Sequence, residues 1–300
     1  MAGELKSAKP PMVRHPLREF DVALAVWAEI VFVAVCHQTN WDRLHGHVMK
    51  IARSEPGKLD PSYLADLDRD LTWGLLGAGL ESRVHLGERS RILNLLGVSA
   101  RERAVRDYLH GVMATPVFLG GPGGFYEFLD SLGPYAEDPL RKKARILVQQ
   151  LARSELITPK DPELLAPAVD YHIIRLYMRT GRVYPARATG YRTYAESKLA
   201  RPATLLSLRK AVEGAMQLTA EFASLRIDDL NHLEWQVARS FCTREEARCN
   251  KGPLPAKLVD LPLVELSQER SGCPVGSACF GRIDAHCRSL VEPRSASSFY

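Results

Sequence analysis

Residues 167–181 read Pro-Ala-Val-Asp-Tyr-His-Ile-Ile-Arg-Leu-Tyr-Met-Arg-Thr-Gly, a run with the signature of a helix that begins at an aspartate. Asp170 follows an apolar pair and precedes apolar residues at helical spacing, so its side chain is suited to cap the free N–H groups of the first turn. A cap followed by a solvated first turn would explain Asp170, His172 and Arg175 structurally. Whether the carboxylate also has a chemical role depends on what accompanies this run elsewhere in the chain.

Helical spacing of apolar residues extends along nearly the whole chain, and sustained alternation with a period of two is hard to find. The pairs Asp60-Pro61, Asp138-Pro139 and Asp161-Pro162 each precede such a stretch, with Asp as the cap and Pro at the first helical position. Residues 99–102 read as a capping box before another helix. The sequence therefore predicts an all-α fold, with helices near 20–36, 41–54, 61–76, 99–114, 123–132, 139–153, 170–180, 202–220 and 227–240.

The composition is that of a globular chain with an uneven charge distribution. The 300 residues include 46% hydrophobic and 25% charged side chains, which excludes wholesale disorder and is enough for two domains. Forty Lys and Arg against 35 Asp and Glu give a formal charge of +5, but residues 139–210 hold fifteen basic and five acidic side chains, or +10. Such a segment is expected of a polyanion-binding face, and also of an ordinary solvated surface.

The only long apolar run, residues 22–36, predicts a buried helix. It is too short to span a bilayer, and it contains Glu29. No signal peptide or lipidation motif is visible, so we expect a cytoplasmic protein with no membrane partner, in which thiols stay reduced.

Six cysteines in such a compartment need an explanation other than disulfides. Cys36 lies alone in the apolar run and is most simply a small core residue. The other five crowd into the last 59 positions, at Cys242, Cys249, Cys273, Cys279 and Cys287. Four thiolates suit a [4Fe–4S] cluster. A structural zinc site is the alternative, although its ligands usually come in closely spaced pairs, which are missing here.

The run around Asp170 and the cysteines together resemble the helix-hairpin-helix DNA glycosylases of the endonuclease III and MutY type. In that family the pattern V-D-x-H-x-x-R-x-x-x-R-x-G carries the catalytic aspartate, and residues 169–181 match it. The family's C-terminal iron–sulfur loop has four cysteines, and the first and last gaps here, of six and five residues, match it. The middle gap departs from the family because it holds 23 residues. The resemblance implies that a [4Fe–4S] cluster is held by Cys242, Cys249, Cys273 and Cys279, with Cys287 as a substitute ligand.

Two further segments extend the resemblance. Gln38 follows the long apolar helix, where the family has a glutamine that enters the gap left by the extruded nucleotide; a polar helix-end residue is the alternative interpretation. In bifunctional members a lysine attacks the sugar, and aligning the apolar residues that follow it implies Lys142, or its neighbour Lys143, as nucleophile. The family's hairpin motif is missing, and this region is more similar to the archaeal 8-oxoguanine glycosylases, which lack the cluster.

The resemblance implies a two-domain fold with DNA in the cleft between the domains. One is a helical bundle of residues 37–165. The other is a helical domain of residues 17–36 and 166–300 that contains the cysteine loop, residues 242–287. The implied partner is double-stranded DNA containing a modified base, and we expect the protein to be a monomer.

The implied activity is that of a DNA glycosylase that cleaves the N-glycosidic bond of a damaged or modified base flipped out of duplex DNA. Asp170 would stabilise the positive charge that develops on the sugar, and a Schiff base with Lys142 or Lys143 would add AP-lyase activity. DNA contacts are implied for Gln38, His172, Arg175, Arg141 and Arg145.

Two alternatives stay open at this point. One is a non-catalytic DNA-binding protein with a metal-stapled tail, and the other is an N-glycosidase that acts on a modified nucleoside or on RNA. The excised base is also open, since the residues that would line its pocket lie in segments without a counterpart. The long insertions favour an unusual or bulky base, in repair or in defence against modified foreign DNA.

Overall fold

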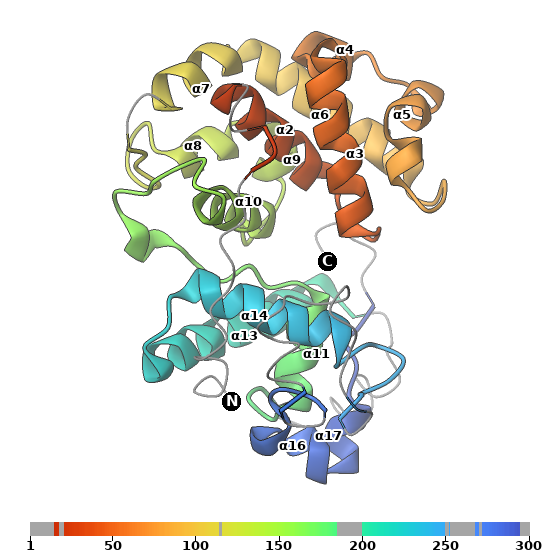
Figure 1. Ribbon diagram of the computed structural model, residues 1–300, viewed down its shortest axis with the longest axis vertical. Coiled ribbons are helices and arrows are strands. Elements are labelled where there is room, and N and C mark those ends of the chain that lie inside the picture. Colours follow the sequence, from red (N-terminus) through yellow and green to blue (C-terminus); the bar gives the residue numbers. More distant parts are fainter. Residues whose placement is uncertain are drawn as a thin grey trace. The chain divides into compact units, whose positions relative to one another are not determined.

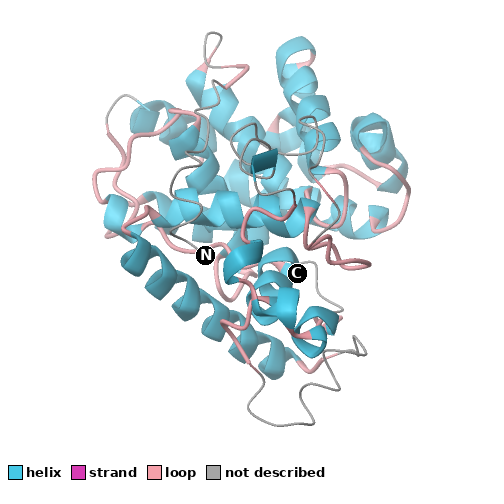
Figure 2. Cartoon of the chain, turned by 60° about the horizontal axis from the view of Figure 1, so that its bottom comes forward, coloured by secondary structure: helices cyan, strands magenta, loops and turns pink. Residues whose placement is uncertain are grey.

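The computed structural model describes residues 15–17, 21–113, 116–184, 200–249, 252, 268–269 and 272–294. Within these ranges the chain is helical (Figure 2). Its strand-like pairings there are isolated bridges of Val117 with Pro159 and of Cys242 with Ala247. The prediction of an all-α fold is therefore confirmed. None of the helices in this part of the chain combines the length and the apolar character needed to cross a membrane.

The chain divides into two compact units, residues 12–165 and residues 166–298. The first unit contains the following helices (Figure 1): α2 (Val22–Val35), α3 (Trp41–Ser54), η1 (Pro56–Leu59), α4 (Pro61–Ala65), α5 (Arg69–Leu76), η2 (Gly77–Gly79), α6 (Leu86–Glu102), α7 (Val105–Met113), α8 (Phe125–Asp130), α9 (Gly133–Ala136), α10 (Lys142–Arg153) and η3 (Pro162–Leu164). The family resemblance implies that residues 17–36 belong with the C-terminal part, whereas in the structure α2 packs against α3, α6, α7 and α10 of the first unit.

Helix α2 forms the centre of the first unit because nearly all of its side chains are apolar and buried. Asp21 caps it by accepting the N–H groups of Ala23 and Leu24 at 2.8 and 3.1 Å. The hydroxyl of Tyr135 donates to the carbonyl of Ile30 at 2.7 Å, which ties α9 to the middle of the helix. A helix that is apolar all round is stable only when other helices cover it on every side, as they do here.

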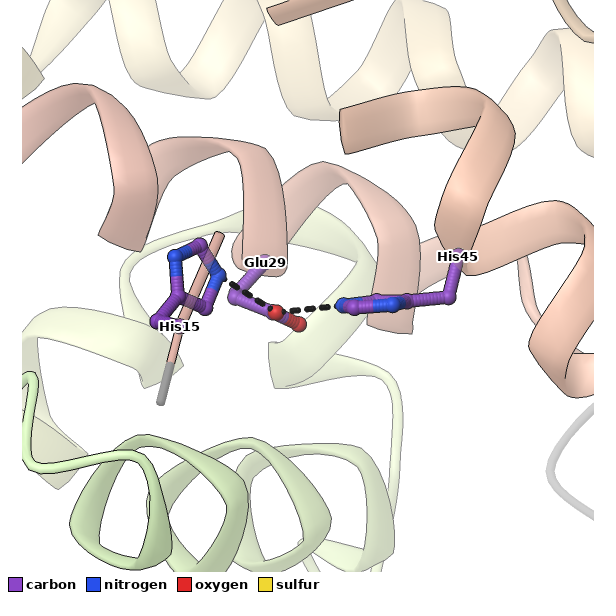
Figure 3. Close-up of side chains that lie close together, drawn as sticks. All are labelled: His15, Glu29 and His45. Atoms are coloured by element: carbon purple, nitrogen blue, oxygen red, sulfur yellow. Dashed lines mark hydrogen bonds and ion pairs between the residues drawn. The ribbon is translucent and has the colours of Figure 1, made fainter. Parts of the chain in front are cut away.

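Glu29 is the polar exception on α2, and it is completely buried. Its Oε1 accepts hydrogen bonds from His15 Nε2 at 2.9 Å and from His45 Nε2 at 2.7 Å (Figure 3). Its Oε2 accepts from the side-chain amide of Gln150 on α10 at 2.8 Å. A buried carboxylate is costly unless it is paired and hydrogen-bonded, and these three donors meet that need.

The distribution of protons in this group follows from one backbone contact. The N–H of Leu17 donates to His15 Nδ1 at 3.1 Å, so the ring proton of a neutral His15 is on Nε2, which faces Glu29. The nitrogen, oxygen and nitrogen atoms of His15, Glu29 and His45 lie within 4.8 Å of one another, as the ligands of a metal ion would. Because Nε2 of His15 carries the proton, however, the geometry is that of a hydrogen-bonded triad.

Two of the predicted helices do not correspond to single helices of the structure. The helix predicted over 61–76 is two helices, because Asp68 turns out of the helical conformation and caps α5 through the N–H of Leu71 at 2.7 Å. The helix predicted over 99–114 covers the end of α6 and all of α7, which are separated at Arg103 and at Ala104, where φ is left-handed at 46°. Ser99 lies inside α6, and its hydroxyl donates back to the carbonyl of Leu95 at 2.8 Å, an alternative to capping that serine also adopts within helices.

Helices α4 and α6 approach each other most closely at Gly97. A Cβ atom there would lie 2.3 Å from the backbone nitrogen of Ala65 and 2.6 Å from the carbonyl oxygen of Pro61, and neither atom can rotate away. Replacing Gly97 by Ala is expected to lower the free energy of unfolding by about 3 kcal/mol, since the two helices must separate. Urea unfolding measures this loss. Gly46, exposed on α3 with open space around it, is the matched control: its replacement by Ala is expected to raise stability by up to about 1 kcal/mol. Equal effects at the two positions would refute the close approach.

The second unit is built around three helices that share one apolar core. Among the described residues of this unit, the helices are α11 (Tyr171–Arg179), α13 (Pro202–Ala223), α14 (Ile227–Ser240), η5 (Gly276–Ala278), α16 (Phe280–Ile283) and α17 (Ala285–Ser289). The core joins Ile174 and Tyr177 of α11 to Val212 of α13 and to Leu233 and Val237 of α14. This packing fixes the N-terminus of α11, where Asp170 lies, against α14.

Candidate functional site

Asp170 caps α11. Its backbone is extended, and its Oδ1 accepts the N–H of Ile173 at 2.9 Å. Its Oδ2 accepts the indole N–H of Trp235, on α14, at 3.0 Å. The side chain is 8% exposed. The carboxylate is therefore held by donors from two helices, and its negative charge is also favoured by the positive end of the α11 dipole.

Arg175, one turn further along α11, makes its contacts inside the unit. It is 1% exposed and donates to the carbonyls of Cys242 and Ala238 at 2.6 and 3.1 Å, and to the Glu292 carboxylate at 2.9 Å. It also donates to Nδ1 of His172 at 2.9 Å. Burial, with a contribution from Arg175, lowers the pKa of His172. Arg175 therefore fastens the segment that begins at Cys242 to α11, and the DNA contacts implied for His172 and Arg175 stay predictions.

Arg179, a further turn along, reaches the cysteines directly. Its guanidinium donates to the sulfur of Cys242 at 3.5 Å and to the carbonyl of Thr243 at 2.7 Å. The thiol of Cys279 lies 3.9 Å from the carbonyl of Arg179, and the N–H of Cys273 lies 3.5 Å from the carbonyl of Cys249. Cysteines from two distant parts of the sequence therefore meet beside the end of α11.

The thiols of Cys242, Cys249, Cys273 and Cys279 lie within electrostatic range of one another. Burial raises the pKa of Cys273, and the other three thiols raise it further. Burial and the neighbouring Cys242 likewise raise the pKa of both Cys249 and Cys279. Among the described residues, the potential metal ligands whose atoms all lie within 4.8 Å of one another are those of His15, Glu29 and His45, and the four thiols do not form such a group. The binding of an iron–sulfur cluster or a zinc ion by these four cysteines therefore stays a prediction from the sequence.

Cys287 has different surroundings from the other four. It is buried on α17, and its pKa is raised by burial and then by Asp284, while Tyr184 lowers it. The long gap between Cys249 and Cys273 contains residues 250–251, 253–267 and 270–271, which lie outside the described residues, as do residues 185–199 of the basic segment.

Gln38 and the two lysines lie in the first unit, Gln38 in the turn after α2 and the lysines at the start of α10, a helix that packs against α2. Gln38 is exposed in the turn after α2 with a left-handed φ of 46°. Lys142 and Lys143 open α10, and both are buried. Their charges act on Cys36 and His37, the two residues that precede Gln38. The turn that carries Gln38 therefore lies beside the N-terminus of α10.

Lys143 has an unusual electrostatic environment. Its side chain is 3% exposed, and burial, with the charge of Lys142 next to it, lowers its pKa to about 8. Its backbone N–H donates to the Asp138 carboxylate at 2.9 Å, which fixes the first turn of α10. A substantial fraction of the Lys143 side chain is therefore the neutral, nucleophilic amine at a mildly alkaline pH.

Arg141 and Arg145, also predicted to contact DNA, flank the two lysines. Arg141 has a left-handed φ of 51°, forms an ion pair with Asp130 and lies over the ring of Tyr126 with 5.8 Å to the ring centre. Arg145 is half-buried on α10, and its charge also acts on Tyr126. Both therefore add positive charge around the start of α10.

Two residues of these surroundings are not among those predicted from the sequence. One is Trp235, the partner of Asp170. The other is Arg89, 1% exposed on α6, which donates to the carbonyls of Val35, His37 and Val84 and so holds the turn that carries Gln38. A signal for Arg89 was available, because it lies among apolar residues on the buried face of an amphipathic helix. Trp235 gives no such signal, since a tryptophan at helical spacing predicts only core packing.

Comparison with known proteins adds no assignment: no protein-family model matches the chain, and no curated protein matches it either.

Proposed function

We propose that this protein is a DNA glycosylase that removes a modified base from duplex DNA. The observation that carries the proposal is the Asp170 carboxylate, which is buried at the N-terminus of α11 and held by two fixed N–H donors. A carboxylate with a fixed direction is suited to stabilise positive charge that develops on a neighbouring group. The cysteines beside the same helix and the basic start of α10 support the proposal.

In the proposed reaction the nucleotide is rotated out of the duplex, and Gln38 fills the space that it leaves. The bond between C1′ and the base then breaks, and the departing base keeps the electron pair. Asp170 stabilises the positive charge on the deoxyribose, and a water molecule adds to C1′ and releases a proton. Exposure and the left-handed backbone of Gln38 support its role, because they put this side chain at the tip of a turn.

A [4Fe–4S] cluster would be held by Cys242, Cys249, Cys273 and Cys279. Bound there, it would act as a structural crosslink, because base excision transfers no electron. Arg175 and Arg179 support this role from the protein side, since both connect α11 to the segment that begins at Cys242.

Metal content tests this assignment. Replacing Cys273 by Ser is expected to abolish the broad absorption at about 400 nm and to reduce bound iron, because one of four thiolate ligands is lost. Replacing Cys36 or Cys287 by Ser is the matched control and is expected to leave iron and absorption unchanged. Stoichiometric zinc in a colourless protein would show that the cysteines bind zinc rather than an iron–sulfur cluster.

The lyase branch of the proposal favours Lys143 over Lys142, because Lys143 is the more deeply buried and its pKa is lowered to about 8. Its neutral amine would attack C1′ in place of water as the base departs, and ring opening with loss of a proton would give a Schiff base. Replacing Lys143 by Ala is expected to abolish borohydride trapping of a protein–DNA adduct, whereas Lys142→Ala retains it. The rate of trapping by the unmodified protein is expected to rise with pH up to about 8 and then level off, since only the neutral amine reacts. Base release without any trapping would make the enzyme monofunctional.

The proposal as a whole is tested with a panel of duplexes that each contain one oxidised, alkylated, mismatched or bulky modified base. Base release and strand nicking are assayed separately. Release from one member supports the glycosylase. Salt-dependent duplex binding with no base release from any member would favour a DNA-binding protein without catalysis. Duplex binding that did not weaken steeply with salt would contradict the prediction that the partner is a polynucleotide.

A further inference from the structure

Trp235 contacts the carboxylate on which the proposed reaction depends. Its indole N–H donates to Asp170 Oδ2 at 3.0 Å, while the N–H of Ile173 donates to Oδ1 at 2.9 Å. The Ile173 bond is an ordinary helix cap, which many aspartates make. The bond from Trp235 is different, since it comes from another helix and fixes the rotation of the carboxylate about its own axis.

The indole ring is itself held in place. The Arg239 guanidinium lies over the ring with 5.0 Å to its centre, and the His172 ring meets it edge-on at 6.2 Å. Trp235 is half-buried, and its helix is anchored in the core by Leu233 and Val237. The donor therefore approaches Asp170 from one direction only.

The same face of α14 also holds the chain that leads into Asp170. Asn231, one turn before Trp235, accepts the N–H of Ala168 through its side-chain oxygen at 2.6 Å. Residues four apart in a helix lie on one face. Helix α14 therefore holds both the backbone before Asp170 and the carboxylate of Asp170.

We propose that Trp235 is a positioning residue for Asp170: its indole N–H sets the direction of the carboxylate toward the reacting sugar. The inference rests on the proposed function, because that function gives Asp170 its role. Indole nitrogen is a donor only, so Trp235 can hold the carboxylate and cannot take part in proton transfer. Without this donor the carboxylate remains at the cap but turns more freely, so it spends less time in the productive orientation.

The first test is independent of activity. The chain has four tryptophans, so the indole region of a ¹H–¹⁵N NMR spectrum contains at most four N–H signals. The signal that is absent from Trp235→Phe belongs to Trp235, and it is expected to move upfield in Asp170→Asn, because a neutral amide oxygen is a weaker acceptor than a carboxylate. The signal of Trp27, whose N–H donates to the carbonyl of Leu59 at 2.6 Å, is expected to stay in place. If the Trp235 signal does not move, the contact and the inference are both wrong.

The second test measures turnover with whichever duplex of the panel releases its base. Trp235→Phe keeps an aromatic ring in the core and removes the donor, so kcat is expected to fall about tenfold with KM and duplex affinity unchanged. Trp27→Phe makes the same chemical change in the first unit and is expected to keep full kcat. Full kcat in Trp235→Phe, with Asp170→Asn inactive, would overturn the inference alone. Full kcat in Asp170→Asn would overturn the proposed function.

Discussion

Replacing Asp170 by Asn is expected to lower the rate of base release by about a thousandfold while duplex binding is kept. Asn caps a helix about as well as Asp does, so α11 should form as before, with the Ile173 N–H still bonded. Only the negative charge is lost, and that charge is the group that would stabilise the sugar in the transition state. Single-turnover excision together with a binding titration at one salt concentration separates the two effects.

A matched control for this substitution is available in the first unit. Asp68 caps α5 through the N–H of Leu71 at 2.7 Å and is exposed, so Asp68→Asn makes the same chemical change at another helix N-terminus. It is expected to leave excision and stability unchanged. If Asp170→Asn excised the base at the rate of Asp68→Asn, Asp170 would be a structural cap and nothing more.

The sequence was a good guide to the helices whose ends are marked by local chemistry. Helix α2 was predicted within about two residues at each end, because a long apolar run between polar residues leaves little choice. The first part of α6 was missed, because the capping box at Ser99 indicates a helix start there, whereas the helix begins at Leu86. Capping rules describe the local preference of a serine. In this helix the burial of apolar residues from Leu86 onward outweighs that preference, so Ser99 lies inside α6.

For the candidate site, the sequence identified single residues better than their partners. Asp170 and the cysteines were found because a cap and a set of thiols have short-range signatures. The partners of Asp170 and of the Gln38 turn, Trp235 and Arg89, lie 65 residues and about 50 residues away along the chain. Such contacts depend on how the helices pack against one another, and the spacing of residues along the chain does not determine that packing.

Replacing Glu29 by Gln is expected to lower the free energy of unfolding by about 3 kcal/mol, because His45 loses the buried carboxylate to which its ring N–H donates a hydrogen bond. Burial by itself raises the pKa of Glu29, but hydrogen bonds from His15 and His45 outweigh it and hold the pKa below its usual value. For His45 burial acts to lower the pKa, and the bond to Glu29 reverses the sign, so the pKa is raised.

The lowered pKa of Glu29 and the raised pKa of His45 define the pH range in which Glu29→Gln loses the most free energy of unfolding. The stabilisation from Glu29 is present above the unfolded pKa of about 4.5 and is lost as the pH falls through its lowered folded pKa. The stabilisation from His45 is complete below the unfolded pKa of about 6.5 and is lost as the pH rises through its raised folded pKa. Urea unfolding of Glu29→Gln is therefore expected to differ most from the unmodified protein between about pH 4.5 and pH 6.5.

The control is Glu55→Gln, which removes an exposed ion pair with Lys58 and is expected to leave the free energy of unfolding almost unchanged at each of these pH values. A loss at Glu29 that did not depend on pH would mean that the carboxylate acts through shape rather than charge. If zinc raised the unfolding temperature of the unmodified protein and not that of Glu29→Gln, the three residues would form a metal site. His15 Nε2 would then bind the metal instead of carrying a proton. Without such a rise, the buried Glu29 carboxylate is stabilised by hydrogen bonds, and these bonds connect α2 to residues 15–17, to α3 and to α10.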